Sequence, residues 1–277
     1  MVDIYEKLAE FKKAGLDAVI VTVTEKEGMA PADVGKKMIV TSGNVAFGTV
    51  GGGAIEYFAR EKCKEVLLKR ESFTEKYVLN DKDIIVDDGD VVLPMACGGK
   101  VTLFYEFIGP KQYVYIFGGG HCGAALARLL KPLGFFITII DDRKEVLDAL
   151  DNSADVKVHE GFADYIEKHG IPNDRYIVVS TPSHLHDFDV LNKIFELNIK
   201  PRYFGMLCSK KKVGDYLEKA RQIHGEIDLT NFYSPIGLQT GGDSPEEVAI
   251  SIAAEILSIY YGKDKVNAHM RDLVKKE

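Results

Sequence analysis

The 277-residue sequence is poor in cysteine and contains no long hydrophobic run. Its four cysteines form no C-x-x-C motif, so the usual pattern of an iron–sulfur or structural zinc site is missing; they are Cys63, Cys97, Cys122 and Cys208. Scattered cysteines of this kind are typical of reduced thiols and favour a cytoplasmic location. No apolar run reaches the roughly 18 residues that a membrane-spanning helix needs. We therefore expect a protein without a metal site and without a membrane anchor.

An excess of positive charge is also missing. The chain carries 35 Lys and Arg against 42 Asp and Glu, which gives a net charge of −7 at pH 7. This balance argues against general binding to nucleic acid or to a membrane surface, since both are negatively charged. The first 15 residues have the pattern of an amphipathic helix and not of a signal peptide. With 46% apolar residues, the chain can build one large domain or two ordinary ones.

The most informative stretch that is present is a glycine-rich motif. Gly118, Gly120 and Gly123 have the spacing G-x-G-x-x-G, after the predicted strand 113–117 and before the predicted helix 122–133. In this motif one glycine permits a tight turn, another lets a phosphate approach the backbone, and the third lets the helix pack closely on the strand. A phosphate can then bind the free N–H groups at the positive end of the helix. The motif predicts a Rossmann unit.

A second predicted strand, 136–140, ends in acidic residues. Asp141 and Asp142 follow it, about 20 residues beyond the first glycine, where an acidic side chain can hold a ribose hydroxyl. Arg143 and Lys144 come next, and basic residues at this place suit the 2′-phosphate of NADP. The choice between NAD and NADP therefore stays open.

The alternation of elements predicts the fold class. Strands are expected at 113–117, 136–140, 156–159, 176–180 and 203–207, and helices at 122–133, 144–150, 161–168, 184–197 and 210–224. This order is typical of an open parallel sheet with helices on both faces. Gly109, Pro110 and Lys111 mark a domain boundary. We expect an α/β protein in which a small α+β N-terminal domain, 1–110, precedes a Rossmann-like doubly wound parallel-sheet domain, 111–277.

The candidate cofactor-binding residues follow from this fold. Ligands of such sheets bind outside the carboxyl ends of the strands. The residues expected to gather there are Gly118, Gly119, Gly120, His121, Cys122, Gly123, Asp141, Asp142, Arg143, Thr181, Ser209 and Lys210. His184 and His186 do not predict a metal site, because histidines two positions apart do not share one helix face.

The N-terminal domain contributes further candidates. Gly51, Gly52 and Gly53 directly precede a predicted helix, so they form either a second anion site or a plain tight turn. One helix start contributes only about 0.3–1 kcal/mol to a nearby charge, so it makes no tight site alone. Cys97, Gly98 and Gly99 precede the predicted strand 100–108. Cys97, between a predicted loop and two glycines, is either an exposed, reactive thiol or a small buried residue beside a turn.

Several motifs in order carry a resemblance to a known family. They are Glu27-Gly28-Met29-Ala30-Pro31, Gly51-Gly52-Gly53 with Glu56, Cys97-Gly98-Gly99, Gly118–Gly123 with Asp141, Tyr203–Lys212, and Pro235-Ile236-Gly237 through Pro245-Glu246-Glu247. Together they resemble the Gly-Ser-Ala-Pro loop, triple glycine, Cys-Gly-Gly, nucleotide turn, Ser-Lys/Arg loop and Pro-Ile-Gly signature of the xanthine dehydrogenase accessory proteins, the XdhC/CoxI family. The resemblance covers residues 16 to 260.

The resemblance implies an accessory role more than a turnover enzyme. Such proteins bind the molybdenum cofactor, as molybdopterin or its dinucleotide, protect it during sulfuration and deliver it to a xanthine dehydrogenase-type molybdenum hydroxylase. The implied partners are that client and a cysteine desulfurase-type sulfur donor. A homodimer is also expected, since the N-terminal domain is small to stand alone. Two other functions stay open from the residues: an NAD(P)-dependent oxidoreductase and a nucleotide-sensing regulatory module. The oxidoreductase lacks a Tyr-x-x-x-Lys pair, since Ala220 follows Tyr216 by four positions.

Three positions depart from the family pattern. Met29 stands where the family usually has serine, Ala32 where it has arginine, and Ala54 where many members have cysteine. One expected anion contact and one expected thiol are therefore missing from the N-terminal domain. Cys97 is left as the more credible thiol for contact with the cofactor that the resemblance implies, since a soft thiolate can bind molybdenum.

Overall fold

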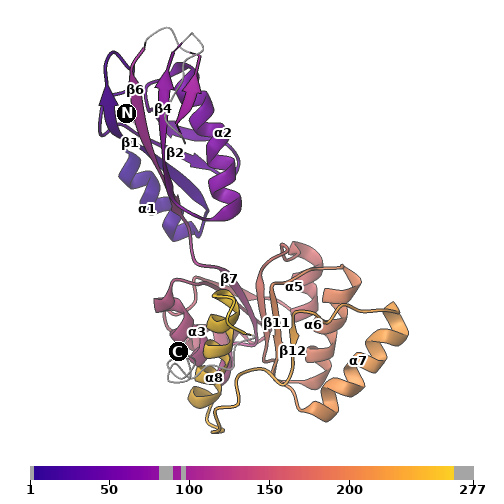
Figure 1. The fold of residues 1–277 in the computed structure, drawn as a ribbon. Helices are drawn as coiled ribbons and strands as arrows, with labels where there is room; N and C mark the ends of the chain where they lie inside the picture. Colours follow the sequence, from indigo (N-terminus) through magenta and orange to yellow (C-terminus); the bar gives the residue numbers. More distant parts are fainter. Residues whose placement is uncertain (1–2, 81–89, 95–97, 265–277) are drawn as a thin grey trace, which may run out of the picture. The chain divides into compact units, whose positions relative to one another are not determined.

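A computed structural model of the chain describes residues 3–80, 90–94 and 98–264. The chain divides into two compact units, Met1–Pro110 and Lys111–Glu277. Each unit has a sheet of its own (Figure 1). Each also has hydrophobic cores of its own. The fold class expected from the sequence is confirmed: a smaller N-terminal unit precedes a Rossmann domain.

The first unit is built on a six-stranded sheet in the order β3-β2-β1-β6-β4-β5. Its strands are β1 (Ala18–Glu27), β2 (Lys37–Thr41), β3 (Ala46–Gly48), β4 (Phe73–Leu79), β5 (Val91–Leu93) and β6 (Lys100–Ile108). All neighbours are antiparallel except β4 and β5. Its helices are α1 (Ile4–Ala14) and α2 (Gly53–Lys69).

Strand β1 shows why this sheet carries a helix on each face. Successive side chains of a strand point to opposite faces. Val19, Val21 and Val23 pack into the core beneath α2, whereas Ala18 and Ile20 pack into a separate cluster beneath α1. The run 18–21 is apolar at every position because both faces of the strand are covered there.

The second unit is a six-stranded parallel sheet in the order β12-β11-β10-β7-β8-β9. Its strands are β7 (Tyr113–Phe117), β8 (Phe136–Asp141), β9 (Val156–His159), β10 (Tyr176–Val179), β11 (Tyr203–Met206) and β12 (Phe232–Tyr233). Its helices are α3 (His121–Leu130), α4 (Lys144–Ala149), α5 (Phe162–His169), α6 (His184–Glu196), α7 (Lys210–His224) and α8 (Pro245–Tyr260).

The two faces of this sheet carry separate cores. Helices α3, α4 and α8 cover one face, and α5, α6 and α7 cover the other. Strand β7 lies in the middle and serves both, since Val114 and Ile116 face the first core and Phe117 the second. The strand order reverses between β7 and β10, which is where ligands of doubly wound sheets bind.

The structure differs from the sequence prediction at the end of the helix 122–133. Helix α3 ends at Leu130, and a 3₁₀ turn, η1 (Lys131–Leu133), completes the segment. Pro132 lacks an amide hydrogen and cannot continue the α-helical bonding. Strands β5 and β12 were missed, because three and two residues are too short to show a period.

Candidate functional site

The three motif glycines of the β7–α3 turn have different surroundings. A Cβ at Gly118, where φ is 110°, would lie 2.2 Å from the carbonyl oxygen of Ser180 beyond β10. A Cβ at Gly123 would lie 2.0 Å from the carbonyl oxygen of Gly118. At Gly120, by contrast, a Cβ would meet no described atom within 4 Å beyond its chain neighbours. Two glycines therefore permit close packing, and the third leaves open space.

The start of α3 offers backbone donors to this open space. Its N-cap is Gly120, no side chain of the described chain caps it, and its first turn contains no acidic residue. The first amides of an α-helix have no partner within the helix, and the helix dipole favours negative charge beside them. The amides of His121, Cys122 and Gly123 are therefore suited to a phosphate.

Asp141, the predicted ribose ligand, is fully buried and already hydrogen-bonded. Its Oδ2 accepts from the Gly119 amide at 2.7 Å and from Arg143 Nη2 at 2.8 Å. Its Oδ1 accepts from the amide and from Nε of Arg143 at 3.0 and 2.9 Å. Burial alone would raise the pKa of Asp141, but these bonds outweigh it and hold that pKa below its ordinary value. The carboxylate thus ties the glycine turn to β8 and to the guanidinium of Arg143.

Two cavities flank the turn, and both are lined by Gly120 and His121. One, of about 320 Å³, is also lined by Cys122, Ser180, Leu207, Asp243, Pro245 and Val248. The other, of about 380 Å³, is also lined by residues that include Arg128, Arg143, Glu145 and Glu246. The first cavity includes the loop before α8, which the capping box of Ser244 and Glu247 holds at the start of that helix. Arg128 was missed, because nothing in the local sequence links it to the turn. Asp243 and Glu246 belong to the Pro-Ile-Gly signature stretch but were not among the predicted site residues.

The burial of Cys122 favours a role in packing over a role as a nucleophile. The residue is half-buried and packs against the core beneath α3. Burial raises the pKa of the Cys122 thiol, and the negative charge of Glu246 adds to the effect. The thiol is therefore protonated at neutral pH and is a poor nucleophile.

Thr181 lies at the same edge of the sheet, in a polar cluster that includes Asp187. The Thr181 hydroxyl lies 2.6 Å from Asp187 Oδ1. Asp187 is only 3% exposed, so burial raises its pKa, although Thr181 and His184 oppose the rise. His184 Nδ1 lies 3.9 Å from Asp187 Oδ2. The Nε2 atom of His184 contacts Nζ of Lys212. The sequence analysis missed Asp187, although it stands three residues after His184 on the predicted helix.

The remaining candidates of this edge are more exposed. Ser209 is the N-cap of α7 but caps it with no side-chain bond, and Lys210 begins the helix on the exposed side. Asp142 has a side chain 36% exposed, and its carbonyl oxygen lies 3.1 Å from His159 Nε2. The parallel sheet therefore brings the predicted residues to one edge, with the glycine turn at the centre.

The glycine turn of the first unit is arranged differently. Glu56 Oε2 accepts from the Thr49 hydroxyl at 2.5 Å and from the Gly52 amide at 3.3 Å. The start of α2 therefore already carries a carboxylate of its own. Gly53 begins this helix, and Gly51 packs against Ala32, since a Cβ at Gly51 would lie 3.1 Å from Ala32 Cα.

The motif segments of the first unit lie against one another. A Cβ at Gly99 would fall 2.4 Å from the carbonyl oxygen of Glu27 and 3.1 Å from the amide of Ala30, and a Cβ at Gly28 would fall 3.1 Å from Gly99 Cα. Gly98, before Gly99, has φ of 69°. The candidate thiol Cys97 lies outside the described residues. In the described ranges, no group of three or more His, Cys, Asp or Glu side chains could hold a metal ion.

Comparison with known proteins gives the family. Residues 114–256 match the XdhC Rossmann domain, and residues 11–78 match the XdhC and CoxI family. The chain belongs to the XdhC family. The resemblance read from the sequence is thereby confirmed. Within the described part of the chain, no helix is both long and apolar enough to cross a membrane.

Two curated relatives and one solved structure are similar to the chain. The uncharacterized protein YqeB of Escherichia coli (strain K12) is 26% identical over 262 residues, which are 93% of this chain and 46% of that protein. A probable xanthine dehydrogenase subunit of Bacillus subtilis (strain 168) is 32% identical over 159 residues, which are 56% of this chain and 45% of that protein. The chain thus spans about half the length of these curated relatives.

The similar solved structure is a xanthine dehydrogenase from Bacillus halodurans. The TM-score is 0.51 at 19% sequence identity, with 98% of this chain and 100% of that chain covered. At this identity the likeness concerns the fold alone.

Proposed function

We propose that this protein is an accessory protein that binds the molybdenum cofactor and delivers it, in sulfurated form, to a xanthine dehydrogenase-type molybdenum hydroxylase. Membership of the XdhC family and the name of the Bacillus subtilis relative support the link to xanthine dehydrogenase. The observation that carries the binding site is the uncapped start of α3 at Gly120, between two cavities. A cysteine desulfurase-type sulfur donor and a homodimer belong to the same proposal.

The residues at this turn fit the phosphate end of the cofactor. Molybdopterin ends in a phosphate, and its dinucleotide form contains a pyrophosphate. The amides of His121, Cys122 and Gly123 would bind such a group, with Arg128 and Arg143 lining the neighbouring cavity. The bound cofactor would supply the molybdenum chemistry, and this chain would hold and shield it. Cys97 as a molybdenum-binding thiol stays a prediction.

The geometry of Asp141 weakens the nicotinamide alternative. An NAD-dependent oxidoreductase or an NAD sensor uses this acid to hold a ribose hydroxyl. Here each carboxylate oxygen already accepts two hydrogen bonds, and the side chain is fully buried. Ribose could reach it only after Arg143 had moved. We therefore favour a ligand bound through its phosphates.

The variant Gly120→Asp tests this proposal. Gly120 has φ of −63° and ψ of −171°, an extended conformation that suits aspartate at an N-cap. Its carboxylate would cap α3 and occupy the place of the phosphate. We expect cofactor retention to fall roughly 100-fold, or about 2.8 kcal/mol, while thermal stability stays equal or rises by a few tenths of a kcal/mol.

The measurement is the molybdenum and pterin that co-elute with the protein after incubation with extracted cofactor and gel filtration. The matched control is Gly43→Asp, since Gly43 lies in an exposed turn of the first unit with only Thr41 Oγ1 near its Cβ, at 3.9 Å. Equal retention by Gly120→Asp and the control would refute the site. Retention by none of the proteins, wild type included, would refute the proposed function.

A further inference from the structure

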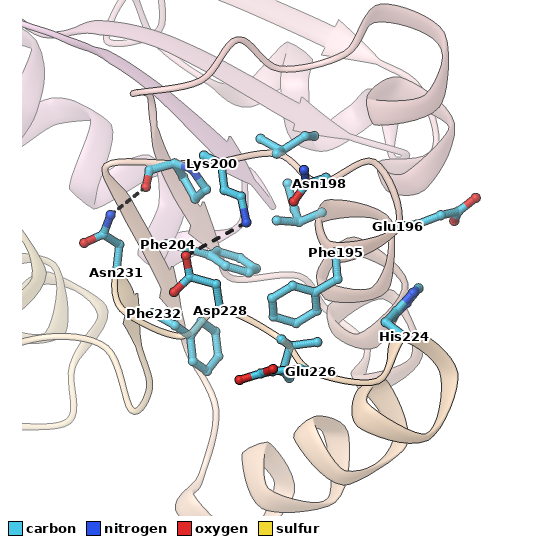
Figure 2. A pocket seen from close by; sticks show the side chains of 14 residues that line it. Phe195, Glu196, Asn198, Lys200, Phe204, His224, Glu226, Asp228, Asn231 and Phe232 are labelled. Carbon is cyan, nitrogen blue, oxygen red and sulfur yellow. Dashed lines mark hydrogen bonds and ion pairs between the residues drawn. The ribbon is translucent and has the colours of Figure 1, made fainter.

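A separate cavity lies at the opposite edge of the second sheet. Its volume is about 390 Å³, and it is formed by the end of α6, the link to β11, the end of α7 and the link to β12 (Figure 2). Because α6 and α7 run back from the carboxyl edge, their last residues lie at the amino edge. The cavity is therefore distinct from the glycine turn.

Aromatic rings form the inner wall of this cavity. The ring centroids of Phe195 and Phe204 lie 6.5 Å apart, and those of Phe204 and Phe232 lie 5.1 Å apart, both edge to face. Phe204 is almost fully buried, whereas Phe195 and Phe232 are partly exposed. The faces of such rings carry partial negative charge and attract cations.

The polar rim of the cavity is more negative than positive. Lys200 Nζ lies 3.9 Å from Asp228 Oδ2, a long ion pair between two half-exposed side chains. Glu226 makes no hydrogen bond or ion pair with any residue in the described ranges. Glu196 pairs with Lys193 at 2.9 Å and extends away from the cavity in Figure 2. The cavity is therefore lined by Glu226 and by Asp228, whose Oδ1 also accepts from the Thr230 amide at 3.0 Å, against the one ammonium group of Lys200.

We propose that this cavity binds an organic cation with an apolar stem, such as an alkylguanidinium or alkylammonium group. The stem would lie against Phe195 and Phe232, and the charged end would pair with Glu226 and Asp228. A phosphate-bearing ligand would meet repulsion from the same carboxylates. The site is independent of the cofactor site, so either can fail without the other. The cation can be a free small molecule or an arginine or lysine side chain of a bound protein.

The test compares two probes of nearly equal shape, butylguanidinium and its neutral analogue butylurea. Binding to the wild-type chain is followed by NMR chemical-shift titration. We expect butylguanidinium to bind at least fivefold tighter, with the largest shifts around Phe195 and Phe232, and to weaken as salt is added. Equal binding of the two probes, or no shift near these residues, would overturn the proposal.

Two variants locate the interaction. Glu226→Gln should weaken butylguanidinium about three- to fivefold and leave butylurea unchanged, as expected for one exposed charge pair. Glu218→Gln removes the same charge from an exposed position of α7 that does not line the cavity, so it should have no effect. An equal effect of both substitutions would mean that only net charge matters, which contradicts a site.

A third probe separates the two sources of the cation. N-acetyl-arginine methylamide presents the same guanidinium on a peptide backbone. Tighter binding of this capped arginine than of butylguanidinium supports a protein side chain as the natural ligand, and weaker binding supports a free small cation.

Discussion

Two helices of this protein begin after glycine-rich turns, and the two turns differ in the charge at the helix start: a carboxylate lies at the start of α2 and none in the first turn of α3. At α2 the fourth helical residue is Glu56, whose carboxylate accepts the Gly52 amide. At α3 the corresponding residue is Ala124, and no side chain of the described residues caps the helix. A glycine-rich helix start therefore does not by itself predict an anion site. The residue one turn further on matters, because the carboxylate of Glu56 bonds the Gly52 amide and places a negative charge where an anion would bind.

The third position of each helix shows a second difference. In α3 it is Gly123, which packs against the carbonyl of Gly118, whereas in α2 it is Ile55, which is buried in the core. In the α3 turn the helix therefore packs closely on the turn at Gly123, while the space beside Gly120 stays open. This combination lets a ligand approach the backbone.

The largest expected effect is a loss of stability when the close packing of the α3 turn is disturbed. Gly123→Ala would place a Cβ 2.0 Å from the carbonyl oxygen of Gly118, and the backbone cannot yield without moving α3 from the sheet. We expect a loss of about 3 kcal/mol in the free energy of unfolding of the second unit, measured by urea denaturation. Gly120→Ala is the control, since its Cβ meets open space, and it should cost no more than about 1 kcal/mol, because alanine is a poorer N-cap than glycine. Equal losses would show that packing does not distinguish the two positions.

The second prediction concerns the link between the turn and β8. Asp141→Asn removes the charge that accepts from Gly119 and Arg143, and should cost about 2–4 kcal/mol. Because the folded pKa of Asp141 is lowered, its contribution is present above the ordinary carboxyl pKa, near 4, and is lost as pH falls through the folded value.

The check for Asp141→Asn is a series of thermal melts of wild type and variant from neutral pH downward. The difference in stability should be constant from neutral pH to about 5 and should shrink below about pH 4. A difference that stays constant down to pH 2, or grows there, would contradict the role given to this carboxylate.

These positions also show how far the sequence alone could lead. The glycine spacing and the alternating elements predicted the Rossmann sheet, because both are local patterns of side-chain type. The sequence also placed Asp141 correctly at the tip of β8. It could not show that Arg143 engages both oxygens of that carboxylate, since the bond depends on side-chain geometry within a turn. Nor could it show that Glu56 bonds back to the Gly52 amide, because a glutamate at that spacing often points to solvent instead.

The smallest expected change in stability belongs to the α2 turn. Glu56→Ala removes the acceptor of the Gly52 amide and of the Thr49 hydroxyl, and should cost about 1 kcal/mol. It should also free the start of α2 for anions, so that the variant gains a weak phosphate-dependent stabilisation absent from the wild type. Thermal melts with and without phosphate measure both effects. Glu61→Gln, at an exposed position of the same helix, is the control.

The most direct test of the difference between the two turns is an amide NMR titration of the wild-type protein with inorganic pyrophosphate. We predict saturable shifts of the Gly120, His121, Cys122 and Gly123 amides, and no shift at Gly51, Gly52 or Gly53. Shifts confined to Gly51–Gly53, or none at either turn, would contradict the assignment of the phosphate site to the start of α3.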